Sequence, residues 1–275
     1  YAVKKFSTTE RIVFYVSAVV LAFSSFFLVV KVNESFLVEI PTRGGSLTEG
    51  VIGSPRFINP LLATSDADRD LTALIYSGLL KATPEGELIP DLAEKFNVSE
   101  NGLVYTFTLK ENLTFHDGLP LTADDIVFTI ARAQDPALKS PKRANWDGVT
   151  AEKVNDREVK LTLRQAYSPF LENTTLGILP KHIWKDADVE QFAFSQFNIE
   201  PIGSGPYKID TVKRNASGIP MYYELTPFKK YALGAPYISS VILKFFSNEK
   251  SLTTAYERGD VESVNSISPQ NAEAL

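Results

Sequence analysis

Two adjacent acids, two histidines and one glycine-flanked serine are the residues of this chain whose types and spacing could support catalysis. Asp124 and Asp125 would have to act as a pair, but neighbouring residues on a helix point about 100° apart and do not converge on one substrate atom. His116 and His182 have no His or Cys neighbour at the spacing of metal ligands. The Gly-Ser-Gly run at 203–205 lacks the spacing of a Gly-x-Ser-x-Gly nucleophile elbow. The sequence therefore predicts a protein that is not an enzyme, with no catalytic residue, metal site or cofactor.

Composition narrows the classes of partner. The 275 residues are 44% hydrophobic and 22% charged, which is ordinary for a globular protein of one or two domains. The net charge of −5 and the lack of a Lys/Arg cluster argue against a nucleic-acid partner. Because the chain has no cysteine, it can form no disulfide and no thiolate metal site.

A strand, a polar turn and a capped helix follow one another between residues 102 and 136. Apolar residues alternate with polar ones over 103–110, which places one apolar face of a strand against a core. The FHDG turn at 115–118 contains an Asp that can bond its own backbone and a Gly that can take a positive φ. Thr122 and Asp125 resemble a capping box. The helix after them is predicted from apolar residues at helical spacing and ends before Asp135-Pro136: Ile126, Val127, Ile130 and Ala131.

The flanking sequence predicts an α/β protein. Strands are expected over 46–52, 94–99, 207–213, 221–226 and 238–246, and hairpins at Asn101-Gly102 and Asn155-Asp156. Helices are expected over 66–76, from Ser168-Pro169, over 188–197, and from a Ser247 cap to Arg258, with Gly259 in the left-handed conformation.

The 102–136 unit resembles the signature of the peptide/nickel-type solute-binding proteins of bacterial ABC importers, known as family 5. Six further elements occur in the order of that family: Gly44-Gly45-Ser46-Leu47, Asn59-Pro60, the run from Ile75 to Leu80, Leu179-Pro180-Lys181-His182, Gly203-Ser204-Gly205-Pro206-Tyr207, and the Arg258-Gly259-Asp260 end of a predicted helix. Each element alone is weak, but seven in order identify the chain as a member of the family. Ser77 stands where the family usually has Glu, and Asn59 replaces a common Asp. These departures bear on the class of ligand and leave the predicted fold unchanged.

The resemblance implies a periplasmic-binding-protein-like α/β fold of type II, with two lobes and an extra inserted domain. The first lobe is then discontinuous and comprises residues 44–78 and 200–275, and the inserted domain covers 79–199. Proteins of the family are longer than this chain, so we expect an N-terminal fragment in which the second lobe is truncated.

The same resemblance places three segments beside the ligand cleft. Peptide clefts hold main chains by hydrogen bonds and side chains in pockets, so loop residues, aromatics and small polar groups are the expected contacts. The candidate ligand-binding residues are Ser54, Pro55 and Phe57 after the first strand, Asn145 and Trp146 in a polar loop, and Asn173 at a helix end. Each segment also has a purely structural interpretation: a strand-to-loop turn, packing of the tryptophan ring, and a polar helix end.

Residues 12–30 are uncharged and about long enough to cross the hydrocarbon core of a bilayer. Lys4, Lys5 and Arg11 precede them, so residues 1–11 are expected to be a cytoplasmic tail, 12–30 a single transmembrane anchor and 31–43 a tether to an extracytoplasmic binding domain, periplasmic or extracellular. Many members of the family are held by an acylated cysteine, which this chain lacks. A cleaved signal peptide and a buried helix are the alternatives.

These expectations favour a membrane-anchored protein that captures oligopeptides and delivers them to an ABC permease by lobe closure. The resemblance leaves open a peptide sensor, or the same fold binding nickel, haem or an oligosaccharide. A membrane-tethered hydrolase is the third class, and it would need a nucleophile, base or metal set that these residues do not supply.

Overall fold

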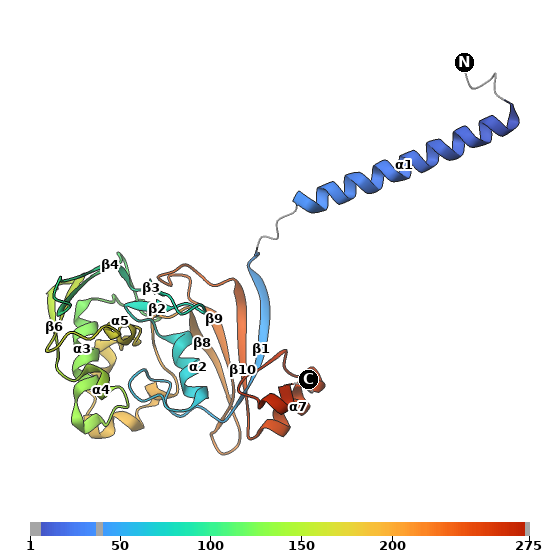
Figure 1. Ribbon diagram of the computed structural model, residues 1–275. Coiled ribbons are helices and arrows are strands. Elements are labelled where there is room, and N and C mark those ends of the chain that lie inside the picture. The colour runs from blue at the N-terminus through green and yellow to red at the C-terminus, as the bar shows by residue number, and fades with distance from the viewer. Residues whose placement is uncertain (1–6, 37–40, 273–275) are drawn as a thin grey trace. The chain divides into compact units, whose positions relative to one another are not determined.

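A computed structural model describes residues 7–36 and 41–272 (Figure 1). The chain forms two units, Tyr1–Thr42 and Arg43–Leu275, each of which is described by itself. The predicted cytoplasmic tail and tether fall partly on residues 1–6 and 37–40, which lie outside the described part of the chain.

The first unit contains one long helix, α1 (Thr8–Phe36). Within the described residues, Thr8–Asn33 is the one stretch of helix long and apolar enough to cross a membrane. Its 26 residues extend over about 39 Å at about 1.5 Å per residue, compared with about 30 Å for the hydrocarbon core of a bilayer. The apolar side chains of this helix are exposed, among them Leu21 and Phe23 at 70% and 73%. Length and composition fit both an anchor and a signal sequence.

The second unit is built on a five-stranded sheet in the order β11-β1-β10-β9-β8. β1 (Gly44–Ile52) lies between β10 (Ile238–Phe246) and β11 (Ser263–Val264) and is parallel to both. β9 (Pro220–Pro227) runs antiparallel to β10 and to β8 (Tyr207–Arg214). The predicted strands at 46–52, 207–213, 221–226 and 238–246 are therefore confirmed, and residues far apart in sequence share one sheet.

Helices cover both faces of this sheet (Figure 1). α2 (Asp66–Ile75) packs on one face, where Val51 and Leu71 are fully buried. α7 (Glu249–Glu257) packs on the other, where Leu252 forms a second small core. Successive strand residues point to opposite faces, so Gly50 faces α7, and a Cβ on it would lie only 2.2 Å from Leu252 Cδ1.

A second, four-stranded antiparallel sheet has the order β4-β5-β7-β6. Its strands are β4 (Ala93–Val98), β5 (Val104–Leu109), β6 (Val149–Asn155) and β7 (Glu158–Leu163). The two predicted hairpins pair β4 with β5 and β6 with β7. α3 (Ala123–Gln134) packs on this sheet and begins with the predicted capping box, in which the Asp125 carboxylate accepts the Thr122 N–H at 2.9 Å.

Short elements join the two sheets. The hairpin of β2 (Leu80–Ala82) and β3 (Leu88–Pro90) follows α2. The 3-10 turn η2 (Pro136–Leu138) and the single-turn helices α4 (Arg143–Trp146), α5 (Phe170–Asn173) and α6 (Lys181–Trp184) follow α3, and α8 (Pro269–Ala272) ends the described chain.

Four local predictions were wrong in detail. The helix predicted over 188–197 is two 3-10 helices, η3 (Val189–Phe194) and η4 (Gln196–Asn198), because Ser195 turns the backbone to an extended conformation and caps the second with its hydroxyl. Asn248, not Ser247, caps α7. α5 has no side-chain cap, and Pro169 occupies its N-cap position. Ala131 is exposed, since the buried face of α3 runs through Ala123, Ile126, Ile130 and Ala133.

Candidate functional site

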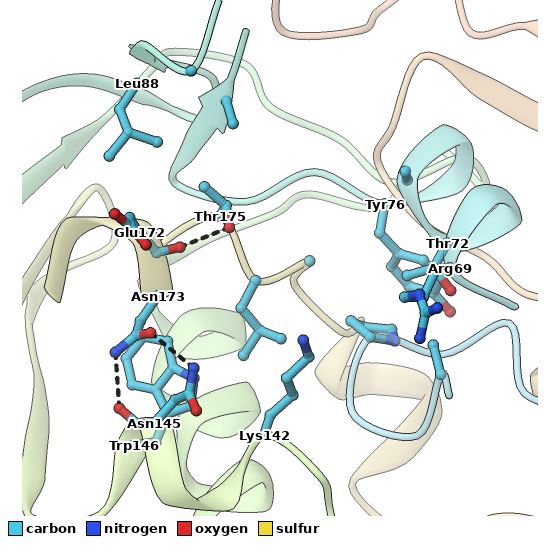
Figure 2. Close-up of a pocket in the computed structure, with 17 residues that line it drawn as sticks. Arg69, Thr72, Tyr76, Leu88, Lys142, Asn145, Trp146, Glu172, Asn173 and Thr175 are labelled. Atoms are coloured by element: carbon cyan, nitrogen blue, oxygen red, sulfur yellow. Dashed lines mark hydrogen bonds between the residues drawn. The ribbon is translucent and has the colours of Figure 1, made fainter. Parts of the chain in front are cut away.

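A pocket of about 550 Å³ opens in the second unit beside α2 (Figure 2). Its lining comes from α2 and the loop before it, the β2–β3 hairpin, α4, and α5 with the residues that follow. Arg69, Thr72 and Tyr76 lie on one side of the pocket, and Asn145, Trp146 and Asn173 lie on the other, with Lys142 between the two groups (Figure 2).

The α2 side is held by hydrogen bonds at the start of the helix. Ser65 and Asp68 form a capping box. The Asp68 carboxylate also accepts the backbone N–H groups of Arg56 and Phe57 at 2.7 and 2.8 Å. Burial alone would raise the pKa of Asp68, but these hydrogen bonds hold the pKa below its usual value. Asp68 is thus a charged structural group that ties the 56–57 turn to α2.

The opposite side is held by a pair of amides. Asn145 Nδ2 donates to Asn173 Oδ1 at 2.9 Å, and Asn173 Nδ2 donates to the Asn145 carbonyl at 3.0 Å. Trp146 is only 2% exposed, and its ring packs edge-on against Phe170 with centroids 5.8 Å apart. The amide pair joins α4 to α5, and the Trp146 ring is packed in the core while it also lines the pocket.

Two buried hydroxyl groups adjoin the pocket. Tyr76 is 5% exposed, and neither its phenol oxygen nor Thr72 Oγ1 has a hydrogen-bond partner in the described part of the chain. Burial raises the pKa of Tyr76, so the phenol stays protonated. An unsatisfied buried hydroxyl costs about 1–3 kcal/mol of stability.

The structure brings together three of the six predicted site residues, namely Asn145, Trp146 and Asn173. Ser54, Pro55 and Phe57 are not in the lining of this pocket. Ser54 Oγ donates to the Pro220 carbonyl at 3.3 Å, Pro55 is buried, and the backbone of Phe57 is held by Asp68. Contact of these three residues with a ligand stays a prediction.

Six polar lining residues are not among the predicted site residues: Arg69, Thr72, Tyr76, Lys142, Glu172 and Thr175. Tyr76 belongs to the 75–80 motif and Lys142 to the polar loop that contains Asn145 and Trp146, and Glu172 and Thr175 lie beside Asn173. These four residues therefore fall in segments that the sequence already marks as candidates. Nothing in the sequence marks Arg69 and Thr72 as pocket residues, because polar residues on a helix look the same in sequence whether they face solvent or line a pocket.

His116 joins two of the sequence motifs. Its Nδ1 accepts the Gly203 N–H at 3.3 Å, and its Nε2 lies 3.1 Å from the Gly205 carbonyl oxygen, to which it donates. One ring nitrogen accepts and the other donates, so the imidazole is neutral. Burial lowers the pKa of His116 to about 4, which agrees with this assignment. His116 therefore has a structural role.

The glycines of the motifs allow main chains to pack directly on one another. A Cβ on Gly203 would lie 2.0 Å from the Ile75 carbonyl oxygen, and one on Gly205 would lie 2.6 Å from the Ile75 carbonyl carbon. A Cβ on Gly78 would lie 2.6 Å from the backbone of Thr175. The motifs thus build the end of α2 and the adjoining pocket wall.

The acidic and histidine candidates for catalysis have structural partners, whereas the buried Ser204 hydroxyl has no hydrogen-bond partner in the described part of the chain. Asp124 forms ion pairs with Lys153 and Lys181, whereas Asp125 is buried in the capping box. His182 Nε2 lies 2.8 Å from Asp117 Oδ2. Across residues 7–36 and 41–272, no cluster of three or more His, Cys, Asp or Glu side chains could hold a metal ion.

The sequence also matches a known family. Residues 87–275, more than half of the chain, match the bacterial extracellular solute-binding proteins, family 5 (Middle). The chain belongs to this family. The predicted membership is therefore confirmed.

Individual members of the family resemble the chain over most of its length. The oligopeptide-binding protein AppA of Bacillus subtilis is 32% identical over 229 residues, which are 82% of this chain and 41% of AppA. The solved structure of AppA in complex with a nonapeptide has a TM-score of 0.73 at 31% identity and covers 81% of this chain and 44% of its own.

Two further solved structures extend the comparison. CtaP from Listeria monocytogenes, an ABC transporter substrate-binding protein, has a TM-score of 0.73 at 35% identity, covering 85% of this chain and 46% of its own. NikZ from Campylobacter jejuni, in complex with Ni(L-His), has a TM-score of 0.71 at 29% identity, covering 80% of this chain and 43% of its own.

This family 5 chain spans less than half the length of these relatives. It has the predicted α/β fold of type II periplasmic binding proteins. The division into a first lobe and an inserted domain stays a prediction.

Proposed function

We propose that the protein captures oligopeptides outside the cytoplasm and delivers them to an ABC permease, with two lobes closing around the ligand. The observation that carries the proposal is the likeness to AppA, a relative named for oligopeptide binding and solved with a nonapeptide. The relatives named above are binding proteins, in keeping with a chain whose acidic and histidine candidates for catalysis have structural partners.

The pocket beside α2 is the part of the ligand site that this chain supplies. It combines amide groups at Asn145 and Asn173 with apolar surface from Leu88 and Leu176 and cationic groups from Arg69 and Lys142. Peptides are recognised by main-chain hydrogen bonding together with side-chain pockets, and this lining offers both.

The α1 helix serves as a membrane anchor in this proposal. Thr8–Asn33 is long enough to span a bilayer, and Arg11 lies at its N-terminal end. Anchoring would keep the binding domain close to a permease in the same membrane. Cleavage of the helix as a signal sequence is the competing outcome.

A nickel chelate is the second candidate ligand, because NikZ was solved with Ni(L-His). No metal-holding cluster is present among the described side chains, so the chelator would have to supply the metal ligands and the pocket would recognise the chelator.

Calorimetry on the full-length protein that contains this chain, in detergent, tests the proposal. Titration with a mixture of tri- to pentapeptides should show saturable binding and an unfolding temperature that rises with peptide concentration, since about 100 Kd of free ligand stabilises by about 2.7 kcal/mol. Folded protein that binds Ni(L-His) and no peptide would overturn the proposal in favour of the chelate.

A further inference from the structure

Lys142 extends its ammonium group toward the middle of the pocket (Figure 2). Its Nζ makes no ion pair or hydrogen bond with any residue that the structure describes. A lysine ammonium has three donors and no acceptor, so its complement is an anionic or strongly accepting group.

The backbone that carries Lys142 is fixed in place. Ser140 is 6% exposed, and its hydroxyl donates to the Leu61 carbonyl at 2.6 Å while accepting the Lys142 N–H at 3.1 Å. The Leu61 segment is held in turn by Asn59, which is fully buried and whose Oδ1 accepts the Leu61 N–H at 2.9 Å. Lys142 therefore starts from a rigid base, which lowers the entropic cost of holding a ligand.

The other cation of the lining is already engaged. The Arg69 guanidinium donates to the Asp66 carboxylate and to the Thr64 carbonyl at 2.6 Å. This pairing reduces the positive charge that Arg69 offers to a ligand. Lys142 therefore supplies the uncompensated positive charge near the centre of the pocket.

Glu172 contributes the negative charge of the lining and is exposed on the α5 wall (Figure 2). Its position divides the pocket into a cationic centre at Lys142 and an anionic edge at Glu172. A ligand that places a carboxylate at the centre and a neutral or cationic group at the edge complements both.

We infer that Lys142 binds a carboxylate of the peptide ligand, so that this pocket favours peptides with an acid at the position that enters it. The inference rests on the proposed peptide-binding function and adds a preference for one ligand chemistry. The carboxylate has two possible sources, an acidic side chain or the peptide C-terminus. Both would make a charge-assisted hydrogen bond with the Lys142 ammonium.

Calorimetry with matched peptides separates these sources. Alanine tetrapeptides with a single Glu at each position are compared with the same peptides carrying Gln, each with a free and an amidated C-terminus. For the natural protein, we expect about a tenfold higher affinity for the peptide that places a carboxylate at Lys142, which corresponds to about 1.4 kcal/mol. Loss of the preference on replacing Glu identifies a side chain, and loss on amidation identifies the C-terminus.

The variant Lys142→Gln should abolish this preference, so that the peptide with the carboxylate and its neutral counterpart bind the variant with equal affinity. Arg143→Gln is the matched control, because this substitution also removes one positive charge. Arg143 is exposed, adjacent to Lys142 in sequence and outside the pocket lining. Equal preferences in Lys142→Gln and Arg143→Gln would overturn the inference while leaving peptide capture intact. If folded natural protein binds none of the peptides, the proposed function fails and the inference fails with it.

Discussion

At the scale of single residues, the side chains that look most reactive in this sequence hold backbone segments together. His116 forms hydrogen bonds with the Gly203–Gly205 segment through both ring nitrogens. The Asp68 carboxylate accepts hydrogen bonds from the backbone N–H groups of the 56–57 turn. Asp125 caps α3. Each group is buried or half-buried with partners that satisfy it, which leaves little capacity for chemistry on a substrate.

Removal of the unpartnered phenol hydroxyl of Tyr76 should not lower the stability of the protein, unlike most substitutions of buried residues. Tyr76→Phe removes a buried hydroxyl that has no hydrogen bond, so the unfolding temperature should stay the same or rise. Tyr223→Phe is the matched control, because the Tyr223 hydroxyl donates to the Ile199 carbonyl at 2.8 Å and its loss should cost about 1 kcal/mol. Thermal unfolding of both variants checks this, and a larger loss in Tyr76→Phe than in Tyr223→Phe would contradict it.

The lowered pKa of His116 predicts a dependence of stability on pH. Its pKa is about 4 in the folded protein and 6.5 ordinarily, so between these values the unfolded chain binds a proton that the folded chain does not. The free energy of unfolding should therefore fall as the pH falls from about 6.5 to about 4, by on the order of 2 kcal/mol from this residue.

Comparison with His116→Gln isolates that contribution. Urea unfolding at several pH values should show a smaller loss of stability toward acid in the variant. Asp91, whose pKa burial raises to about 6, acts in the opposite direction but equally in both proteins. Parallel curves for the two proteins between pH 6.5 and pH 4 would exclude the assigned role of His116.

At the scale of elements, the motif glycines set how closely α2 and its neighbours pack. Gly203→Ala would place a Cβ 2.0 Å from the Ile75 carbonyl oxygen, and the main chain would have to shift. We expect a loss of at least about 3 kcal/mol, from overpacking of backbone against backbone. Gly218→Ala is the control: Gly218 has a φ of +78° and open space around it, so the loss there should be about 1 kcal/mol. Equal losses in urea unfolding would show that close packing is not the reason for Gly203.

Strands and capped helices could be predicted from sequence because their signals are local. Alternation identified β5, Asn101-Gly102 and Asn155-Asp156 identified the β4–β5 and β6–β7 turns, and Thr122 with Asp125 identified the start of α3. The 188–197 segment could not be predicted, because the cap of Ser195 competes with a continuous helix.

The candidate site could be predicted only in part. Asn145, Trp146 and Asn173 were found through resemblance to a family. Arg69 on α2 and Lys142 at the start of α4 line the same pocket although they are far apart in sequence, and this arrangement depends on tertiary structure that no local pattern encodes.

At the scale of the whole molecule, the proposed anchoring by α1 can be tested separately from ligand binding. If the helix is an anchor, the mature protein remains in the membrane fraction after alkaline washing, and mass spectrometry finds residues 12–30 in it. A soluble mature protein whose N-terminus lies beyond residue 30 would instead identify α1 as a cleaved signal sequence. The fold of the second unit is expected to be the same in either case.

The most direct test of peptide capture at the α2 pocket is amide hydrogen exchange of the full-length protein with and without a saturating tri- to pentapeptide mixture. We predict slower exchange in residues 60–76, 142–146 and 172–177, which contain most of the lining, and unchanged exchange in the β4–β5 hairpin. Saturable binding that leaves all three segments unprotected would contradict the assignment of the ligand site to this pocket.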